Sequence, residues 1–199
     1  MITINIRHNF PEVAAALGRL SADIGNKALV RALNTTVNQG RPAMARAISK
    51  EYRVTVAQAK ERLDIRRATA KGGGVRLEAA LLATRRGKGR GMNLIHFVTR
   101  IPQRTKRGKL AQLKFQIKRT GGAQTIKGAF VATNPKTGGR AVFIREGRAR
   151  MPIKTLTTID IPQMFNAKRI NGAIRTVMLE RFDINFKREL RSVLKGYAK

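Results

Sequence analysis

The chain has 199 residues, of which 42 are Lys or Arg and 11 are Asp or Glu, so its formal charge is +31. The absence of Cys excludes disulfides, thiolate zinc sites and a cysteine nucleophile. Solubility needs a net charge of only about 2 to 8, so this excess indicates a polyanionic partner, of which DNA or RNA is the usual one.

An anionic membrane is a weaker candidate for the partner. No segment approaches the roughly 18 apolar residues that a membrane-spanning helix requires. Residues 1–7 alternate apolar and polar side chains and contain no apolar signal core. We therefore expect no targeting signal that would direct the chain out of the cytoplasm in which it is made.

The first 26 residues predict a strand, a helix and a break. Residues 2–6 alternate apolar and polar side chains with the period of a strand. Pro11 suits the first turn of a helix that is predicted to end near Leu20. Ser21–Asn26 is predicted to interrupt the helical pattern.

A longer helix is predicted over Asn26–Tyr52, with a kink or a stop near Gly40 and Pro42. Thr55 is placed to cap a third, short helix over Val56–Leu63. The predicted core face of the long helix consists of Leu29, Leu33, Thr36, Ala43, Ala47 and Ile48.

Between Lys71 and about residue 146 the pattern changes to that of strands. Asn134–Gly139 is a turn-forming sequence that suits a hairpin. Since no helix-length crossover separates the strands, antiparallel pairing is expected. The predicted strands are Val75–Ala79, Leu94–Val98, Leu113–Ile117, Ile126–Ala132 and Ala141–Ile144.

Two Gly-rich, basic stretches between these strands are predicted to be mobile loops that contact DNA or an acidic partner. From Ala79 through Arg145 there are sixteen Lys and Arg and no carboxylate. Lys and Arg on a mobile loop can follow phosphates without fixed geometry. The predicted contact residues are Arg85, Arg86, Lys88, Arg90, Arg104, Lys106, Arg107 and Lys109.

The C-terminal third returns to a helical pattern. A short turn is predicted over Pro162–Phe165, and a long amphipathic helix over Gly172–Tyr197. The fold class is therefore α+β, with one domain over residues 1–199. It comprises a helical part (1–70), an antiparallel sheet or partly closed barrel (71–160), and C-terminal helices (161–199). The predicted core stripe of the long helix is Ile174, Val177, Met178, Phe182, Phe186, Leu190, Val193, Leu194 and Tyr197.

Catalytic chemistry finds little support in this sequence. His8 and His96 are the only histidines, and His96 lies in an apolar segment where packing is the expected role. The carboxylates are scattered; Glu61 and Asp64, for example, are expected to pair with neighbouring Lys and Arg. A nuclease needs grouped carboxylates for Mg²⁺, so we expect neither an enzyme, a metal site nor a cofactor.

Aromatic readout of single-stranded nucleic acid is a further alternative. Phe97, Phe115, Phe130 and Phe143 all fall in predicted strands, as they would in a stacking platform. Packing in the core is the commoner role of Phe in an alternating strand. No helix-turn-helix or zinc-finger spacing is present, so the charge supports only sequence-independent binding.

Two stretches of the chain resemble the prophage minor tail protein Z family. The first, over residues 28–69, is a helix of small residues followed by a basic segment that ends in Arg67-Ala68-Thr69. The second, over residues 126–165, has a distinctive order of short motifs. Its structural motif residues are Gly128, Phe130, Phe143, Arg145, Pro152 and Pro162.

The resemblance implies a structural virion protein of a tailed bacteriophage that completes the head-proximal end of the tail, beside the tail terminator. It transfers no catalytic residue. Because tails are rotationally symmetric tubes, a ring of six copies is expected. Such a ring could hold the end of the genomic double-stranded DNA, or dock on an acidic terminator, neck or tube protein.

The alternative function is that of a sequence-independent nucleic-acid-binding protein of ribosomal or nucleoid type. It explains the charge, but it explains neither the apolar C-terminal helix nor the order of the motifs. On the leading interpretation, the protein is made in the host bacterial cytoplasm and resides in the virion tail.

Overall fold

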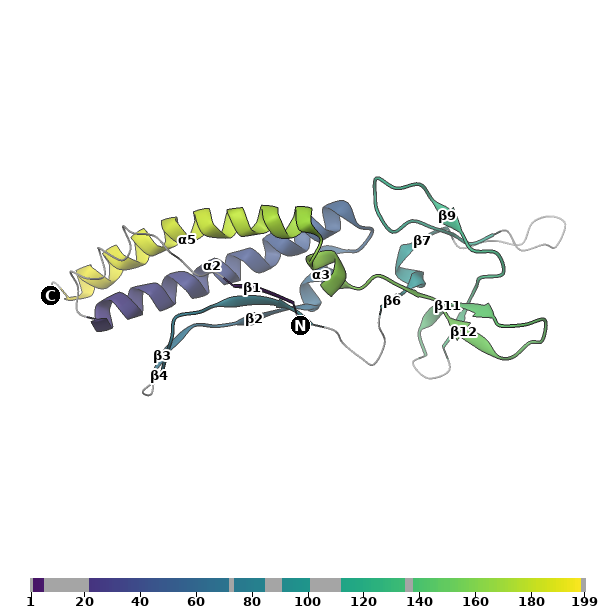
Figure 1. Ribbon diagram of the computed structural model, residues 1–199, viewed down its shortest axis with the longest axis horizontal. Coiled ribbons are helices and arrows are strands. Elements are labelled where there is room, and N and C mark those ends of the chain that lie inside the picture. The colour runs from purple at the N-terminus through teal and green to yellow at the C-terminus, as the bar shows by residue number, and fades with distance from the viewer. Residues whose placement is uncertain are drawn as a thin grey trace.

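The computed structural model describes residues 2–5, 22–71, 74–84, 91–100, 112–134 and 138–197. Figure 1 shows an elongated molecule in which a helical body continues at one end into a group of small sheets. We call this group, residues 91–158, the β lobe. Buried apolar side chains of both parts belong to one continuous core.

The body is built around two antiparallel helices, α2 (Ala22–Glu51) and α5 (Lys168–Tyr197), which lie side by side (Figure 1). Apolar side chains recur on each helix at steps of three and four residues, which gives each helix one face to bury. Leu33 of α2 and Phe182 of α5 are both fully buried. Burying such a side chain contributes about 1.5–3 kcal/mol. The packing of α2 against α5 is therefore a main source of the stability of the fold.

A three-stranded antiparallel sheet packs against α2, in the order β1 (Ile2–Asn5), β5 (Ala80–Ala83), β2 (Leu63–Arg66). Leu81 of the central strand pairs with Ile4 on one side and Ile65 on the other. The hairpin of β3 (69–71) and β4 (74–76) follows β2. Helix α3 (56–61) connects α2 to the sheet, and the short helix α4 (161–165) precedes α5.

The β lobe consists of three open antiparallel sheets and one 3-10 helix. The 3-10 helix, η1, spans Leu94–Phe97. The sheets have the orders β6-β13, β7-β8-β9 and β10-β11-β12. Their strands are β6 (Met92–Asn93), β7 (Val98–Arg100), β8 (Lys114–Phe115), β9 (Gln124–Thr125), β10 (Phe130–Thr133), β11 (Arg140–Arg145), β12 (Ile153–Thr155) and β13 (Thr157–Thr158).

Hydrogen bonds at the end of α2 fix the lobe to the body. The Arg119 guanidinium Nε donates to the Ser49 carbonyl at 2.7 Å, and the Arg53 amide donates to the Ile117 carbonyl at 2.9 Å. Arg62, which precedes β2, lies 3.8 Å from the carboxylate of Asp160, which caps α4. Since these contacts hold the middle of the lobe and the segment that follows it, they restrain how the lobe moves relative to the helices.

The helical predictions are confirmed in outline and corrected in detail. The predicted break is wrong over residues 22–26, because α2 begins at Ala22. The predicted stop near Gly40 and Pro42 is also wrong, because α2 runs through both residues. Thr55 caps α3 as predicted, but this helix ends at Glu61. The helix predicted over 11–20 lies outside the described residues.

Helix α5 confirms the predicted C-terminal helix and begins four residues earlier, at Lys168. Most of the predicted stripe is buried or half-buried. Val177 and Leu194 are exceptions, with 39% and 40% of their surface exposed. Tyr197 lies at the end of the helix, and nothing is described of its side chain.

The strand predictions fare less well. Residues 94–97 form η1 rather than a strand, because the Asn93 side chain accepts the Ile95 amide and starts a helical turn. The change to strands occurs at Leu63, before the predicted Lys71. The predicted hairpin is confirmed as β10 paired with β11. The partly closed barrel is wrong, since the described sheets are small and open.

Candidate interaction surface

Positive charge is concentrated in the β lobe. Residues 91–158 contain 15 Lys and Arg and a single carboxylate, Glu146, whereas the other ten carboxylates lie in residues 1–84 and 159–199. Side chains of the same charge can share a small fold only where water screens them. Accordingly, every described Lys and Arg of the lobe is exposed: Arg100, Lys114, Lys118, Arg119, Lys127, Arg140, Arg145, Arg148, Arg150 and Lys154.

The sheet β10-β11-β12 forms part of this surface. Phe130 and Phe143 pair directly across β10 and β11, with their ring centroids 6.2 Å apart. The Arg145 guanidinium lies 5.1 Å from the centre of the Phe130 ring, and its Nη1 donates to the Arg150 carbonyl at 2.7 Å. The sheet therefore holds one cation in a defined position, beside Arg150 on the loop between β11 and β12.

Arg145→Ala is expected to lower the free energy of unfolding modestly. A cation over an aromatic ring contributes about 0.5–1 kcal/mol at an exposed site, and the hydrogen bond to Arg150 is lost with it. Urea unfolding of this variant checks the value. Arg148→Ala is the matched control, because Arg148 is an exposed neighbour whose loss is expected to change stability by less than about 0.5 kcal/mol. Equal effects of the two substitutions would contradict the proposed role of Arg145.

Five of the six motif residues lie in or beside this sheet. Gly128 precedes β10 and has a φ of 80°, which a side chain would strain. Phe130, Phe143 and Arg145 lie on the strands, and Pro152 follows a cis peptide bond before β12. The sixth, Pro162, occupies the first turn of α4 in the body, after the capping residue Asp160.

The eight predicted contact residues, from Arg85 to Lys109, lie outside the described residues, so their predicted role stays a prediction. Four exposed basic residues on or beside the sheet β10-β11-β12 were not among the contact residues predicted from the sequence. Strand β11 buries three consecutive residues, Ala141, Val142 and Phe143, so no alternation of burial marked these basic residues. They are Arg140, Arg148, Arg150 and Lys154.

The phenylalanines are mainly core residues. Phe97, Phe115 and Phe143 are at most 5% exposed, and Phe130 is half-buried beneath Arg145. Phe97 lies in η1, so the predicted stacking platform loses one strand position. The three buried rings cannot stack on bases, so exposed charge is the main means by which this lobe can attract a polyanion.

His96 lies at the surface of η1, where its Nδ1 is 3.1 Å from the side-chain nitrogen of Gln58. Partial burial, and then the positive charge of Arg62, lower the pKa of His96 below 6.5. Arg62 lies 3.8 Å from the carboxylate of Asp160, and Asp64 accepts a hydrogen bond from the Thr84 hydroxyl. The described residues contain no group of three or more His, Asp or Glu that could hold a metal.

Stability is expected to fall as the pH is lowered through about 6.5, the ordinary pKa of His. The unfolded chain takes up a proton at His96 there, while the folded protein does so only at lower pH. The loss should therefore level off below the folded-state pKa. NMR titration of the ring protons measures that pKa, and His96→Gln should remove this step from the stability profile. A folded-state pKa above 6.5 would contradict the assignment.

Comparison with known proteins gives one match. The sequence model of a family described as prophage minor tail protein Z (GPZ) matches residues 12–199. No curated protein and no solved structure matches the chain. The family match spans the body and the β lobe alike, and it confirms the resemblance drawn from residues 28–69 and 126–165.

Proposed function

The chain belongs to the prophage minor tail protein Z family, and from this membership we propose that it completes the head-proximal end of the tail. The family is one of structural proteins of the phage tail, which places the protein in the virion tail among other tail or neck proteins. None of the helices in the described residues is long and apolar enough to span a membrane. The finer position, beside the terminator at the junction with the head, is our proposal.

We further propose that the protein acts as a ring, with six copies around the tail axis. A tail is a rotationally symmetric tube, so a protein that closes its end repeats with the symmetry of the tube. The elongated shape suits a radial arrangement in which the body and the β lobe lie at different distances from the axis (Figure 1).

The observation that supports a role at the DNA path is the separation of charge within the chain. The β lobe has 15 Lys and Arg against one carboxylate, and all the described ones are exposed. Six lobes facing the lumen would concentrate this charge where the genome end enters the tail. Release of counterions from DNA would then hold that end in place without reading its sequence.

An acidic protein surface is the alternative partner for the same charge. Binding to a terminator or tube ring would share the dependence on salt, since both are electrostatic. It would not depend on DNA. Tails assembled without heads separate the two, because a contact between proteins persists there and a contact with the genome end does not.

Labelling of the protein in intact particles tests its position. An affinity tag on the C-terminal end of α5, detected with gold by electron microscopy, is expected at the junction of head and tail. The same label on a tail-tube protein serves as a control for access along the tail. Label at the tail tip, or particles without label, would overturn the proposal. Protein found on cellular nucleic acid instead would favour a sequence-independent nucleic-acid-binding protein.

A further inference from the structure

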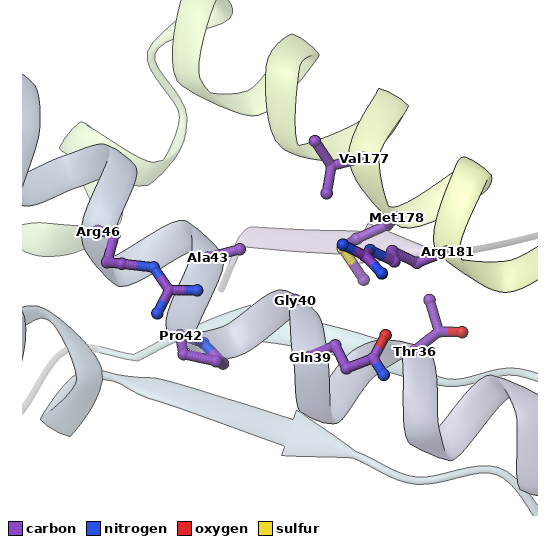
Figure 2. Close-up of a pocket in the computed structure, with 9 residues that line it drawn as sticks. All are labelled: Thr36, Gln39, Gly40, Pro42, Ala43, Arg46, Val177, Met178 and Arg181. Carbon is purple, nitrogen blue, oxygen red and sulfur yellow. The ribbon is translucent and has the colours of Figure 1, made fainter. Parts of the chain in front are cut away.

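A recess opens between the two long helices of the body. It has a volume of about 410 Å³ and is lined by nine residues of α2 and α5. Figure 2 shows Gly40 in the middle, with Arg46 of α2 and Arg181 of α5 on opposite sides of it. The recess therefore combines an uncharged centre with two cationic side chains.

The sequence explains why the helices leave space here. Gly40 lets Met178 of α5 approach closely, because a Cβ at this position would lie only 2.9 Å from the Met178 sulfur, so the open space lies beside this contact. Pro42 and Ala43, on the next turn of α2, are small. Pro42 also lacks an N–H, so the carbonyl four residues before it, on exposed Asn38, has no partner along the helix. Small residues thus form a hollow that larger ones would fill.

The apolar wall of the recess continues onto α5. Val177 is 39% exposed there, whereas Met178 is buried behind it. Next to the recess, the Asn185 side-chain amide donates to the Thr36 hydroxyl at 3.0 Å and to the Gln39 side-chain oxygen Oε1 at 3.2 Å. These two bonds satisfy the buried amide donors and fix the helices at this level, so the shape of the recess is set before anything binds.

Both arginines are available for an anion. Arg46 and Arg181 are exposed, and neither has a carboxylate within ion-pair distance among the described residues. Other charged side chains of α5 behave differently: Lys187 lies 3.0 Å from Asp183, and Arg188 lies 3.0 Å from Glu189. Two unpaired guanidinium groups beside an apolar hollow suit a ligand that has a carboxylate next to an apolar side chain.

We propose that this recess binds an acidic segment of a different tail protein, with a carboxylate at Arg46 and Arg181 and an adjacent apolar side chain against Val177 and Ala43. Charge selects a different protein over a second copy of this chain. The chain has 42 basic residues and 11 acidic ones, and the one carboxylate of its β lobe, Glu146, stands between Arg145 and Arg148. DNA is disfavoured because a phosphate backbone has no apolar group to enter the hollow.

This inference does not depend on DNA binding by the β lobe. It concerns residues of the helical body, and it needs only that the protein lies among other tail proteins, as its family does. If the β lobe does not bind DNA, the proposal for the recess is unaffected. If the recess binds no other tail protein, the proposal for the β lobe is unaffected.

A single thiol at the rim of the recess allows a direct test. Because the chain has no Cys, Val177→Cys creates a unique site for a short photo-crosslinker. The labelled protein is added to tails assembled without it, irradiated, and analysed by mass spectrometry. The expected product joins position 177 to a peptide of another tail protein that has Asp or Glu beside an apolar residue. Thr176→Cys, exposed and outside the recess lining, is the control.

Two changes to the recess should lower the crosslink yield. Arg46→Gln with Arg181→Gln removes the charges and is expected to reduce the yield at least roughly tenfold, the effect of losing about 1.4 kcal/mol of binding. Ala43→Leu keeps the charges and fills the hollow, with a similar expected loss. Arg175→Gln, an exposed residue of α5 outside the lining, should change little. Circular dichroism and the Tm of each variant confirm that it folds.

Three results would overturn the proposal. The first is a crosslink from position 177 to this chain itself or to DNA. The second is a yield at position 177 no higher than at position 176. The third is an unchanged yield in folded protein after both arginines have been replaced by glutamine.

Discussion

Replacing Phe182 by alanine is expected to lower the free energy of unfolding by about 3–5 kcal/mol. Phe182 is fully buried on α5, and its ring stacks on that of Phe186 with the centroids 5.9 Å apart. Truncation removes apolar contacts with α2 and leaves a cavity that two fixed helices can only partly close. Urea unfolding at constant salt measures the change, since ionic strength alters the self-repulsion of a chain with a charge of +31.

Ile184→Ala is the matched control for this prediction. Ile184 lies two residues further along α5 and is 57% exposed. Its truncation removes side-chain atoms that already contact water, so the expected change is within about 0.5 kcal/mol. Comparable losses for the two variants would mean that α2 and α5 do not pack in solution as they do in this fold.

Helix α2 shows how far the sequence could predict the body. The spacing of Leu29, Leu33 and Ile48 predicted a helix with the correct buried face, because the periodicity records burial directly. Gly40 and Pro42 were interpreted as a kink or a stop, and the stop is wrong because α2 runs through both residues. Gly40 instead allows a close contact with Met178. Pro42 is tolerated because the residue whose carbonyl loses its helical partner, Asn38, is exposed. Which of these roles a Gly or Pro has depends on the neighbouring helix, and α5 is distant in sequence.

Strand β5 and the 3-10 helix η1 show where the local sequence no longer predicts the secondary structure. Ala80–Ala83 contains no β-branched or aromatic residue, and it becomes a strand because β1 and β2 pair with it on both sides. Leu94–Phe97 is mostly apolar, yet Asn93 turns it into a 3-10 helix by accepting the amides of Ile95 and Val142. A short apolar run is compatible with either structure until its tertiary partners are known.

The basic surface of the β lobe and the recess between α2 and α5 also differ in how far the sequence predicts them. The charge of the β lobe is a property of composition, so the sequence alone predicted a polyanionic partner. The recess depends on Arg46 and Arg181 facing each other across Gly40 (Figure 2). No sequence signal brings these two arginines together, since their proximity arises only from the packing of α2 against α5.

Neutralising the predicted contact loops is expected to cause the largest loss of binding. Each phosphate contact contributes about −0.9 to the slope of log K against log salt on duplex DNA. If all eight residues from Arg85 to Lys109 contact phosphates, their replacement by Gln should reduce the steepness of that slope by about 7. Fluorescence anisotropy of a labelled duplex, measured over a range of salt concentrations, gives the slope.

A second variant with the same net charge separates specific contact from bulk charge. It replaces eight exposed basic residues of the helical body by Gln: Arg31, Lys60, Arg66, Arg67, Arg76, Lys168, Arg169 and Arg175. If the loops contact DNA, only the loop variant loses the salt dependence, and it should also lose DNA retention and infectivity in particles. Equal losses in both variants would indicate attraction to the overall charge. An unchanged slope in the loop variant would remove the loops from the DNA path, and the exposed cations around β11 and β12 would then become the next surface to neutralise.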